Sequence, residues 1–563
     1  MAESVFLWVK GLRFAYPECA VLDNLSLAWP PGLALVRGDE STGKTTLLRL
    51  LAGELTAQAG SITLHTGSAL VSHADGGYTG GDITINATRA AGGALGGGGT
   101  AGITATGATI MGASVSLQAQ SDYDDSGVVV SLPLTLPDST AAISLTDTQV
   151  SASGTLAIGA KASVDTSPLG DTPLAISVVN SSATVNVAGT SVLSSTGNAT
   201  LSAESTVKST VKPTGLGLSE TADAAVAIST ISSTATVVVG GSSAITSGGA
   251  LELSAKNDVQ AETVADISAR PTAVGGTVAV TELTTVTQAS IEDAAQTSSA
   301  SLNVKAESKN TVLNTAKAAA KGAQKQPEAG KTPANASQTE KSLEKYKDEG
   351  STSEGSVDVA AAVAIVSLNS QTQASIGSSA LQTTAGLATV SSVASNVSTV
   401  DADGSTVGEG ADVGIGAAFA LNIGALTNTA LIGDNAQISA NGLTLQANVP
   451  AGGTNTFATS SKSGAGASNV GVAGSLAINT LANTTTALIQ GDSDSSGTGA
   501  SVDAGTGDIL IEAGNASTST VTAGAEVQGT GEEAKVGVGA SVGVNVVANK
   551  TVAEVADLAV ISG

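Results

Sequence analysis

Val472-Ala-Gly-Ser-Leu-Ala-Ile-Asn-Thr480, followed by Thr484-Thr-Thr-Ala-Leu-Ile489, carries the pattern that decides the fold. It holds an apolar-small-apolar triplet centred on Ala477, and an apolar pair, Ala487 and Ile489, ten and twelve residues after that centre. Six further copies occur in the chain. The other triplets are Leu174-Ala175-Ile176, Val226-Ala227-Ile228, Val278-Ala279-Val280, Val363-Ala364-Ile365, Phe419-Ala420-Leu421 and Val542-Gly543-Val544. Their pairs are Val185/Val187, Val237/Val239, Ala289/Ile291, Ala374/Ile376, Ala430/Ile432 and Ala553/Val555. A unit that recurs in this way indicates a repeat architecture.

The spacing of the units predicts how they pack. The central residues of the triplets lie 52, 52, 85, 56, 57 and 66 residues apart. Residues two apart share one face of a strand, and a third alternating apolar segment, such as Leu251-Glu-Leu253-Ser-Ala255, often follows the pair. One unit has too little apolar material to bury its own face, but stacked units cover one another. We therefore expect a mainly β fold, a β-solenoid (β-helix-like) array in which each unit supplies two or three turns.

A string of β-sandwich modules of the bacterial Ig-like kind is the alternative fold. Such modules need larger core residues and strands at a regular spacing of about 8–12 residues. Aromatic residues make up 2% of the 563-residue chain, whereas 41% of its residues are hydrophobic. Small apolar side chains in register favour the narrow core of a solenoid over the core of a sandwich.

Charge and cysteine content limit the partners of the array. The formal net charge is −25, most of it beyond residue 65, so nucleic acid and anionic membrane surfaces are unfavourable partners. The single Cys19 permits no internal disulfide. The sequence contains no run of about 20 apolar residues, so no membrane-spanning helix is predicted. The first residues, Met-Ala-Glu-Ser, lack the basic start of a secretory signal.

The front of the chain follows a different pattern. Short strands are expected at Val5–Val9 and Ser26–Trp29, and a buried strand at Gly32–Val36 leads into a phosphate-binding loop. That loop reads Gly38-Asp39-Glu40-Ser41-Thr42-Gly43-Lys44-Thr45, and a helix with four leucines is expected over Thr45–Leu51. In a strand–loop–helix setting, backbone N–H groups surround phosphate oxygens, Lys44 reaches the terminal phosphates and Thr45 holds Mg²⁺.

Residues 12–64 resemble the start of ABC-transporter nucleotide-binding domains. The resemblance rests on Leu12-Arg-Phe-Ala-Tyr16, Val21-Leu-Asp-Asn-Leu-Ser-Leu27, the loop itself, Thr46-Leu-Leu-Arg-Leu-Leu-Ala-Gly53 and Gly60-Ser-Ile-Thr-Leu64. It implies that Tyr16 stacks on adenine, that residues 38–46 bind ATP with Mg²⁺ at Thr45, and that an ABC-type transmembrane subunit is a partner. Ser41 departs from the family, which usually has glycine there.

The rest of an ATPase is missing from the sequence. We find no glutamine loop, no apolar strand ending in Asp-Glu and no switch histidine, since His65 and His73 lie too early. The nearest match to the signature motif is Ser247-Gly248-Gly249, and we interpret it as a turn between repeat strands. Hydrolysis is therefore not expected, and we assign no catalytic residue.

These patterns divide the chain into five segments. Residues 1–65 form the partial ABC-type segment, and residues 66–165 form the start of the β-rich array. The solenoid repeats are expected at residues 166–309 and 356–563, and the final repeat is cut off in mid-pattern. Residues 310–355 are expected to be a Lys/Ala-rich insertion, helical around Val312–Lys321 and otherwise loose. Asp122, Asp124 and Asp125, or the Asp/Ser/Gly-rich stretch Gly491–Gly507, would offer Ca²⁺ clustered oxygens, although no repeated calcium motif is present.

The array, residues 80–563, resembles the repetitive regions of large bacterial surface and secreted proteins of the adhesin, filamentous-haemagglutinin and autotransporter-passenger kinds. That resemblance implies a non-catalytic structural or adhesive region without a cofactor, with an unknown surface ligand, at the cell surface or secreted despite the missing signal. The alternative is a cytoplasmic ATP-binding protein with the array as an appendage. Under the first interpretation, the structural or adhesive region, the ABC-like segment is joined to the array by gene rearrangement or by an assembly or gene-calling error.

Overall fold

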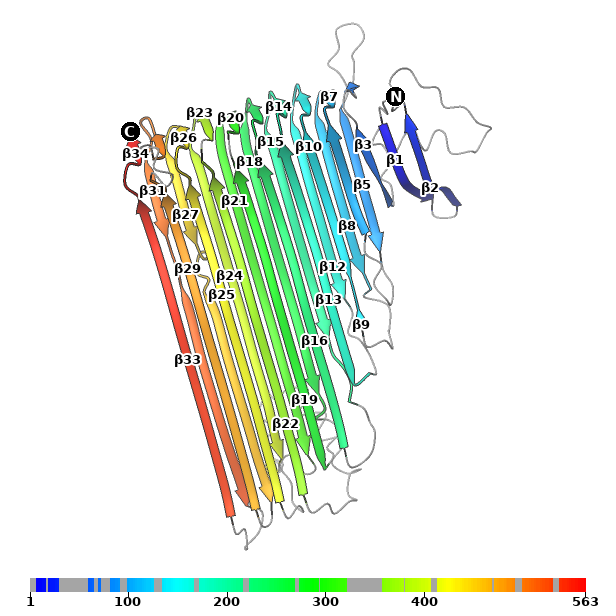
Figure 1. Cartoon of the computed structure of the whole chain (residues 1–563), viewed down its shortest axis with the longest axis vertical. Coiled ribbons are helices and arrows are strands. Elements are labelled where there is room, and N and C mark those ends of the chain that lie inside the picture. Colours follow the sequence, from blue (N-terminus) through cyan, green and yellow to red (C-terminus); the bar gives the residue numbers. More distant parts are fainter. Residues whose placement is uncertain are drawn as a thin grey trace, which may run out of the picture.

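The computed structural model describes residues 7–16, 19–29, 59–64, 69–71, 82–91, 99–125, 134–166, 172–215, 222–268, 273–292, 294–320, 357–378, 380–406, 413–467, 470–491, 499–529 and 536–563. All regular elements in these ranges are strands, which form three sheets called A, B and C below. Apart from the hairpin at the start, neighbouring strands are parallel and one repeat apart, the arrangement of a β-solenoid (Figure 1). The predicted mainly β class is confirmed, and the sandwich alternative is excluded because its strands would not stack in parallel coils.

Each coil adds one strand to sheet A, a short one to sheet B and one or two to sheet C. Sheet A holds β2 (Cys19–Trp29), β1 (Leu7–Tyr16), β3 (Ala59–Leu64), β6 (Gly99–Thr106), β10 (Asp138–Thr146), β13 (Leu174–Ala188), β16 (Ala222–Val239), β19 (Val274–Ile291), β22 (Val357–Ile376), β25 (Val413–Ile432), β29 (Val470–Ile489) and β33 (Val536–Val555), with β9 (Leu134–Thr135) beside β13. Sheet B holds β4 (Ala69–Val71), β7 (Thr109–Gly112), β11 (Gln149–Ala152), β14 (Val192–Ser195), β17 (Ala244–Ser247), β20 (Gln296–Ser299), β23 (Leu381–Thr384), β26 (Gln437–Ser439), β30 (Ser501–Asp503) and β34 (Val560–Ser562). Sheet C holds β5 (Ile83–Ala91), β8 (Val115–Asp124), β12 (Leu156–Thr166), β15 (Ala199–Val211), β18 (Ala250–Asp266), β21 (Ser301–Ala320), β24 (Ala388–Thr406), β27 (Leu443–Asn448), β28 (Asn455–Ala467), β31 (Ile509–Ala513) and β32 (Ser517–Gly529).

The register of sheet A follows the predicted columns. The triplet centres pair in the order Ala175, Ala227, Ala279, Ala364, Ala420, Ala477 and Gly543. The first members of the pairs follow in the order Val185, Val237, Ala289, Ala374, Ala430, Ala487 and Ala553. Both columns are buried in the first six copies, whereas Ala553 and Val555 are exposed because β33 has a neighbouring strand on only one side.

Two expectations about the coil are wrong. Each unit supplies one turn rather than two or three, since β16, β17 and β18 together span one repeat. The triplet and the pair lie on one long strand, and these strands reach 20 residues in β22, β25, β29 and β33. Because a strand rises about 3.3 Å per residue and neighbouring strands lie about 4.8 Å apart, a coil is roughly 65 Å wide but adds about 4.8 Å to the stack.

The insertion also begins later than expected. Residues 310–320 lie in β21, which pairs with β18 on one side and β24 on the other, so the helix predicted over 312–320 is wrong. Ladder hydrogen bonds on both edges outweigh the helix propensity of its Ala and Lys residues. Lys321 and residues 322–356 lie outside the described part of the chain, and register resumes across them, with Ala279 paired to Ala364.

The front segment joins sheet A. Its strands β1 and β2 form an antiparallel hairpin, and β3 pairs antiparallel with β1 and parallel with β6. Sheet A therefore runs through the change in sequence pattern near His65 without a break between strands. The predicted strand at Gly32–Val36 and the helix at Thr45–Leu51 lie outside the described residues.

The coil interior has two apolar cores with polar side chains between them. One core lies beside sheet B and contains the apolar pairs, such as Val185 and Val237. The other lies farther from sheet B, toward the beginnings of the sheet A strands, and contains the triplet centres from Ala175 to Ala420. Between them, Ser181 is hydrogen-bonded to Ser205 at 2.7 Å, Ser205 to Ser233 at 2.8 Å, and Ser233 donates to Asn257 at 2.7 Å. These residues alternate between sheets A and C, so this series, called the polar ladder below, runs along the stack. Its mutual hydrogen bonds offset the cost of burying polar groups.

The corner between sheets A and B repeats a tight turn. Asp147, Gly189 and Gly241 occupy equivalent positions in three coils, with φ of 51°, 68° and 68°. The backbone N–H and hydroxyl of Thr190 both donate to Oδ1 of Asp147, at 2.8 and 2.9 Å. Those hydrogen bonds lower the pKa of Asp147. Glycine suits this corner because φ is positive and the next coil lies close.

Candidate interaction surface

The residues predicted to bind nucleotide are not brought together by the described structure. Tyr16 is the last residue of β1, where its backbone pairs with Cys19. Gly38, Asp39, Glu40, Ser41, Thr42, Gly43, Lys44, Thr45 and Thr46 lie outside the described residues. ATP binding, with Mg²⁺ at Thr45, therefore stays a prediction. Ser247-Gly248-Gly249 does lie where β17 ends and β18 begins, as its interpretation as a turn required.

Of the acidic residues considered for calcium, Asp122 and Asp124 lie on the same outer side of β8, whereas Asp125 is buried. Asp122 is partly exposed and accepts hydrogen bonds from Gln120 at 2.7 Å and Ser163 at 2.5 Å. Across the described ranges, no group of three or more His, Cys, Asp or Glu side chains could hold a metal ion. Of Gly491–Gly507, residues 492–498 lie outside those ranges. No described helix is long and apolar enough to cross a membrane.

The two broad outer faces of the solenoid differ in chemistry. On sheet C, outward residues form ion pairs along and across the strands: Lys161–Glu204 at 3.5 Å, Lys256–Glu204 at 3.7 Å, Lys208–Asp165 at 3.1 Å, Lys212–Glu262 at 2.8 Å and Lys305–Glu307 at 2.8 Å. Such exposed pairs contribute little to stability. They identify the outer face of sheet C as a solvated surface.

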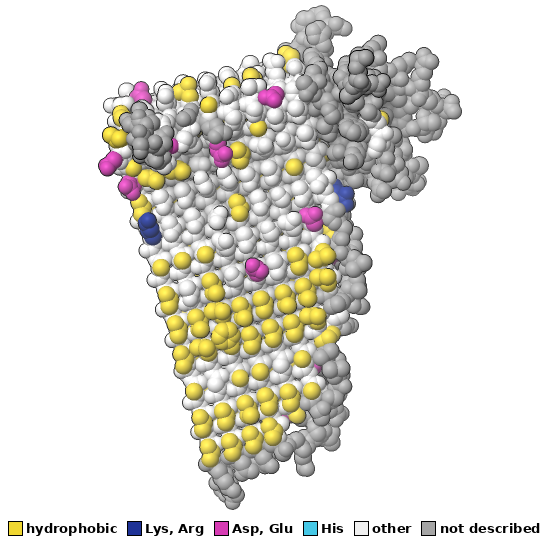
Figure 2. Space-filling view, in the orientation of Figure 1, with side chains coloured by type: hydrophobic (Ala, Val, Ile, Leu, Met, Phe, Trp, Pro, Cys, Tyr) yellow, Lys and Arg dark blue, Asp and Glu magenta, His cyan; other side chains and the backbone are white. Residues whose placement is uncertain are grey.

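The outer face of sheet A carries apolar side chains over half the length of its strands. Each of β19, β22, β25, β29 and β33 places four residues outward in matching register, and all are apolar except the glycines at 276 and 474. We call these residues the apolar face: Val274, Gly276, Val278 and Val280; Val359, Ala361, Val363 and Ile365; Ile415, Ala417, Phe419 and Leu421; Val472, Gly474, Leu476 and Ile478; and Val538, Ala540, Val542 and Val544. Figure 2 shows them as bands of apolar side chains across the lower half of the molecule.

No polar side chain interrupts the apolar face, and its members are exposed or partly exposed. Val542 keeps 54% of its surface exposed and Val274 keeps 48%. Farther along β22 the outward residues change to polar ones: Ser367, Asn369, Gln371, Gln373 and Ser375. At the position of Ser367 the other strands differ: β19 has Glu282 and β29 has Thr480, whereas β25 and β33 continue with the exposed Ile423 and Val546.

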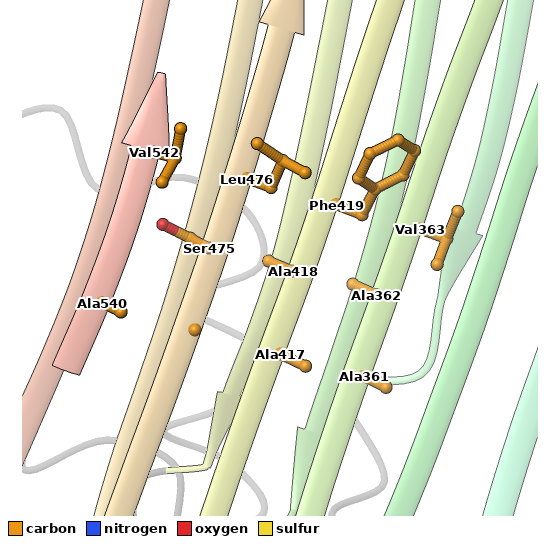
Figure 3. A pocket seen from close by; sticks show the side chains of 11 residues that line it. Ala361, Ala362, Val363, Ala417, Ala418, Phe419, Ser475, Leu476, Ala540 and Val542 are labelled. Atoms are coloured by element: carbon orange, nitrogen blue, oxygen red, sulfur yellow. The ribbon is translucent and has the colours of Figure 1, made fainter. Parts of the chain in front are cut away.

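A shallow groove crosses the strands within this face. Its floor is the row of small residues Ala361, Ala417, Gly474 and Ala540, which we call the groove row. The next row, Val363, Phe419, Leu476 and Val542, forms one wall, and we call it the ridge row. Figure 3 shows both rows on their four strands, with the ring of Phe419 standing beside the floor. The groove has a volume of about 350 Å³.

The large side chains face outward because the coil is narrow beneath them. A Cβ on Gly416 would lie 2.1 Å from the carbonyl oxygen of Gly464 in the opposing sheet C. A Cβ on Gly404 of sheet C would likewise lie 1.8 Å from the carbonyl oxygen of Ala417. Sheets this close leave room mainly for small inward side chains along this part of the strands, so the large residues of the triplets take the other face.

The apolar face was missed in the sequence although its residues had been noted. The flanks of the repeat triplets, such as Phe419 and Leu421, face outward, while the small central residue, Ala420, is buried. The sequence did carry one signal, the size of the central residue. A position that is Ala or Gly in every copy indicates a core too narrow there for the large residues on either side of it.

Comparison with known proteins adds no relative. No family model, no curated protein and no solved structure matches this chain.

Proposed function

We propose that the array is the non-catalytic, adhesive region of a bacterial cell-surface or secreted protein, and that its contact surface is the apolar face of sheet A. The observation that carries this proposal is the difference between the two broad faces: one solvated and charged, the other apolar and continuous across five strands. Soluble proteins rarely expose so large an apolar surface unless something binds to it.

The geometry favours adhesion over a simple spacer role. Each repeat of 52–66 residues lengthens the stack by only about 4.8 Å, yet it adds a strip roughly 65 Å long to each face. A chain selected for length would use narrower coils. A chain selected for contact area gains surface with every repeat.

Location tests this proposal directly. Antibodies against the full chain would be applied to intact and to lysed cells of a bacterium that expresses it from its natural locus. Labelling of intact cells, or recovery of the chain from the medium, is the expected result. A signal that appears only after lysis, at the level of a cytoplasmic marker, would contradict the proposal.

The phosphate-binding loop favours a second candidate function, ATP binding by an ABC-like protein that works with a transmembrane subunit. A fluorescent ATP analogue, titrated into the full chain with Mg²⁺, tests it. Saturable binding that is lost in Lys44→Ala would support this function, because Lys44 would contact the terminal phosphates. A flat titration, or one unchanged by Lys44→Ala, would remove it.

A further inference from the structure

The apolar face is large enough for a stable protein–protein interface. Its five strands span about 24 Å, and its four rows span about 26 Å. The outward residues of β16, Ala222, Ala224, Val226 and Ile228, extend it to roughly 750 Å². A typical stable interface buries about 800 Å² per partner. The extended face therefore matches one such interface.

The shape of the face is complementary to itself. A two-fold axis that crosses the strands between the groove row and the ridge row would place each strand opposite its own copy, running antiparallel. The groove row of one copy would then receive the ridge row of the other. By the same symmetry, the row of Ile415 would lie opposite the row of Leu421. Every row of the apolar face would meet an apolar row.

The charges of the chain also fit this pairing. The chain carries a net charge of −25, so two copies repel each other unless their charges stay apart. The described ion-paired residues lie on the outer face of sheet C. Pairing through sheet A keeps the two C faces on opposite sides of the dimer. An anionic lipid surface would instead meet the full negative charge of the chain with no basic residue in the apolar face.

We propose that two copies of this chain pair face to face through the apolar face of sheet A, with the ridge row of each copy in the groove row of the other. This pairing rests on the proposed role of the apolar face as the contact surface and names a second copy of the chain as what that face contacts, but it does not depend on the location of the protein. It makes the dimer a double solenoid with charged, solvated faces on both sides.

Charge substitution tests the face. Sedimentation velocity of the full chain in the micromolar range should give a mass twice the 54.1 kDa of one chain. The double variant Phe419→Glu/Leu476→Glu should be monomeric, with a dissociation constant raised at least about a hundredfold, because two carboxylates per copy would be buried without partners. Its matched control, Thr427→Glu/Thr484→Glu, adds the same charges to outward positions of the same two strands beyond the apolar face and should remain dimeric. Far-UV circular dichroism checks that both variants are folded.

Groove filling tests the fit without adding charge. A Cβ on Gly474 would meet no atom within 4 Å, so Gly474→Val is accommodated by the fold. The variant Ala417→Val/Gly474→Val makes the face more apolar but fills half of the groove floor. A merely sticky surface would associate more strongly. The proposed fit requires weaker association, by about tenfold or more.

Four outcomes would overturn the proposal. These are a monomeric wild-type chain, a dimer that survives Phe419→Glu/Leu476→Glu, stronger association of Ala417→Val/Gly474→Val, or a monomer that floats with phosphatidylcholine vesicles. The second would assign association to another surface, such as the open edge of β33. None of them bears on whether intact cells display the chain, so a failure here is distinct from a failure of the proposed function.

Discussion

The side-chain amide of Asn310 donates a 2.8 Å hydrogen bond to Oδ1 of Asn396, 86 residues away and one coil farther along the stack. Asn396 in turn donates to Asn455 of the next coil at 3.2 Å. All three side chains are buried. They continue the polar ladder that lies between the two apolar cores, so this ladder links coils whose sequences are far apart.

Replacing the middle asparagine should destabilise the stack. In Asn396→Ala the amide groups of Asn310 and Asn455 each lose one of their buried partners and a cavity is left, which together cost about 1–3 kcal/mol. The measurement is the urea midpoint of unfolding by circular dichroism. Ser395→Ala, an outward neighbour on the same strand, is the control and should change stability by less than about 0.5 kcal/mol. Equal midpoints for the two variants would show that the ladder does not stabilise the coils.

Two glycines in neighbouring strands should respond oppositely to alanine. Gly416→Ala places a methyl group against the backbone of Gly464, and because neither backbone can move freely we expect a loss of about 3 kcal/mol or more. Gly474→Ala meets open space and should be neutral or stabilise by up to about 1 kcal/mol, since glycine is unfavourable within a strand. Thermal unfolding of both variants measures the difference. Similar melting temperatures would contradict the close approach of sheets A and C.

Stability should fall at high pH through one tyrosine. Burial, together with the charge of Asp125 and a hydrogen bond to it, raises the pKa of Tyr123 from 10.0 to about 12. An acid whose pKa is higher in the folded state binds its proton more tightly there than in the unfolded state. Its contribution to the free energy of unfolding is therefore complete below about pH 10 and is lost as pH rises from about 10 toward 12. Urea midpoints at about pH 9 and about pH 11 should fall more steeply for the wild type than for Tyr123→Phe. Parallel pH profiles would show that the Tyr123 phenol does not titrate in this way.

Removal of one whole coil should be tolerated. Ala227 and Ala279 are register partners 52 residues apart, so deletion of residues 227–278 joins the start of β16 to the remainder of β19 in register. Each coil contacts only its neighbours, and the shortened chain should fold with a similar melting temperature. Deletion of half that length, residues 227–252, places a sheet C segment in sheet A and should abolish cooperative unfolding. Equal behaviour of the two deletions would contradict one coil per repeat.

The sequence predicts that the repeats stack in register, but it does not predict which face of each sheet A strand points into the core. The columns through Ala227 and Val237 follow from spacing alone, because parallel coils of one repeat must bring equivalent residues together. A triplet such as Val226-Ala227-Ile228 has apolar residues on both faces of its strand, so alternation cannot identify the inner one. That choice depends on the distance between sheets A and C, which is set by glycines such as Gly416.

Other features of the fold were not predicted because the same residues also fit a different local structure. The Ala- and Lys-containing stretch in residues 310–320 favours a helix locally, but its neighbours on both sides are strands in register. The polar ladder escaped notice because Ser and Asn are also the residues expected in turns. For the apolar face, exposed large residues are ordinary in soluble proteins, and only their alignment over five strands makes a surface.

The orientation of the triplets is the central claim, and the reactivity of introduced thiols tests it most directly. In a Cys19→Ser background, Leu174→Cys and Ala175→Cys place single thiols at adjacent positions of β13, outside the apolar face. Leu174 is 37% exposed and Ala175 is fully buried, so the thiol at 174 should react with an aromatic disulfide reagent on mixing, and the thiol at 175 only in denaturant. Rapid reaction at 175 with protection at 174 would mean that the large residues line the core, contradicting the account.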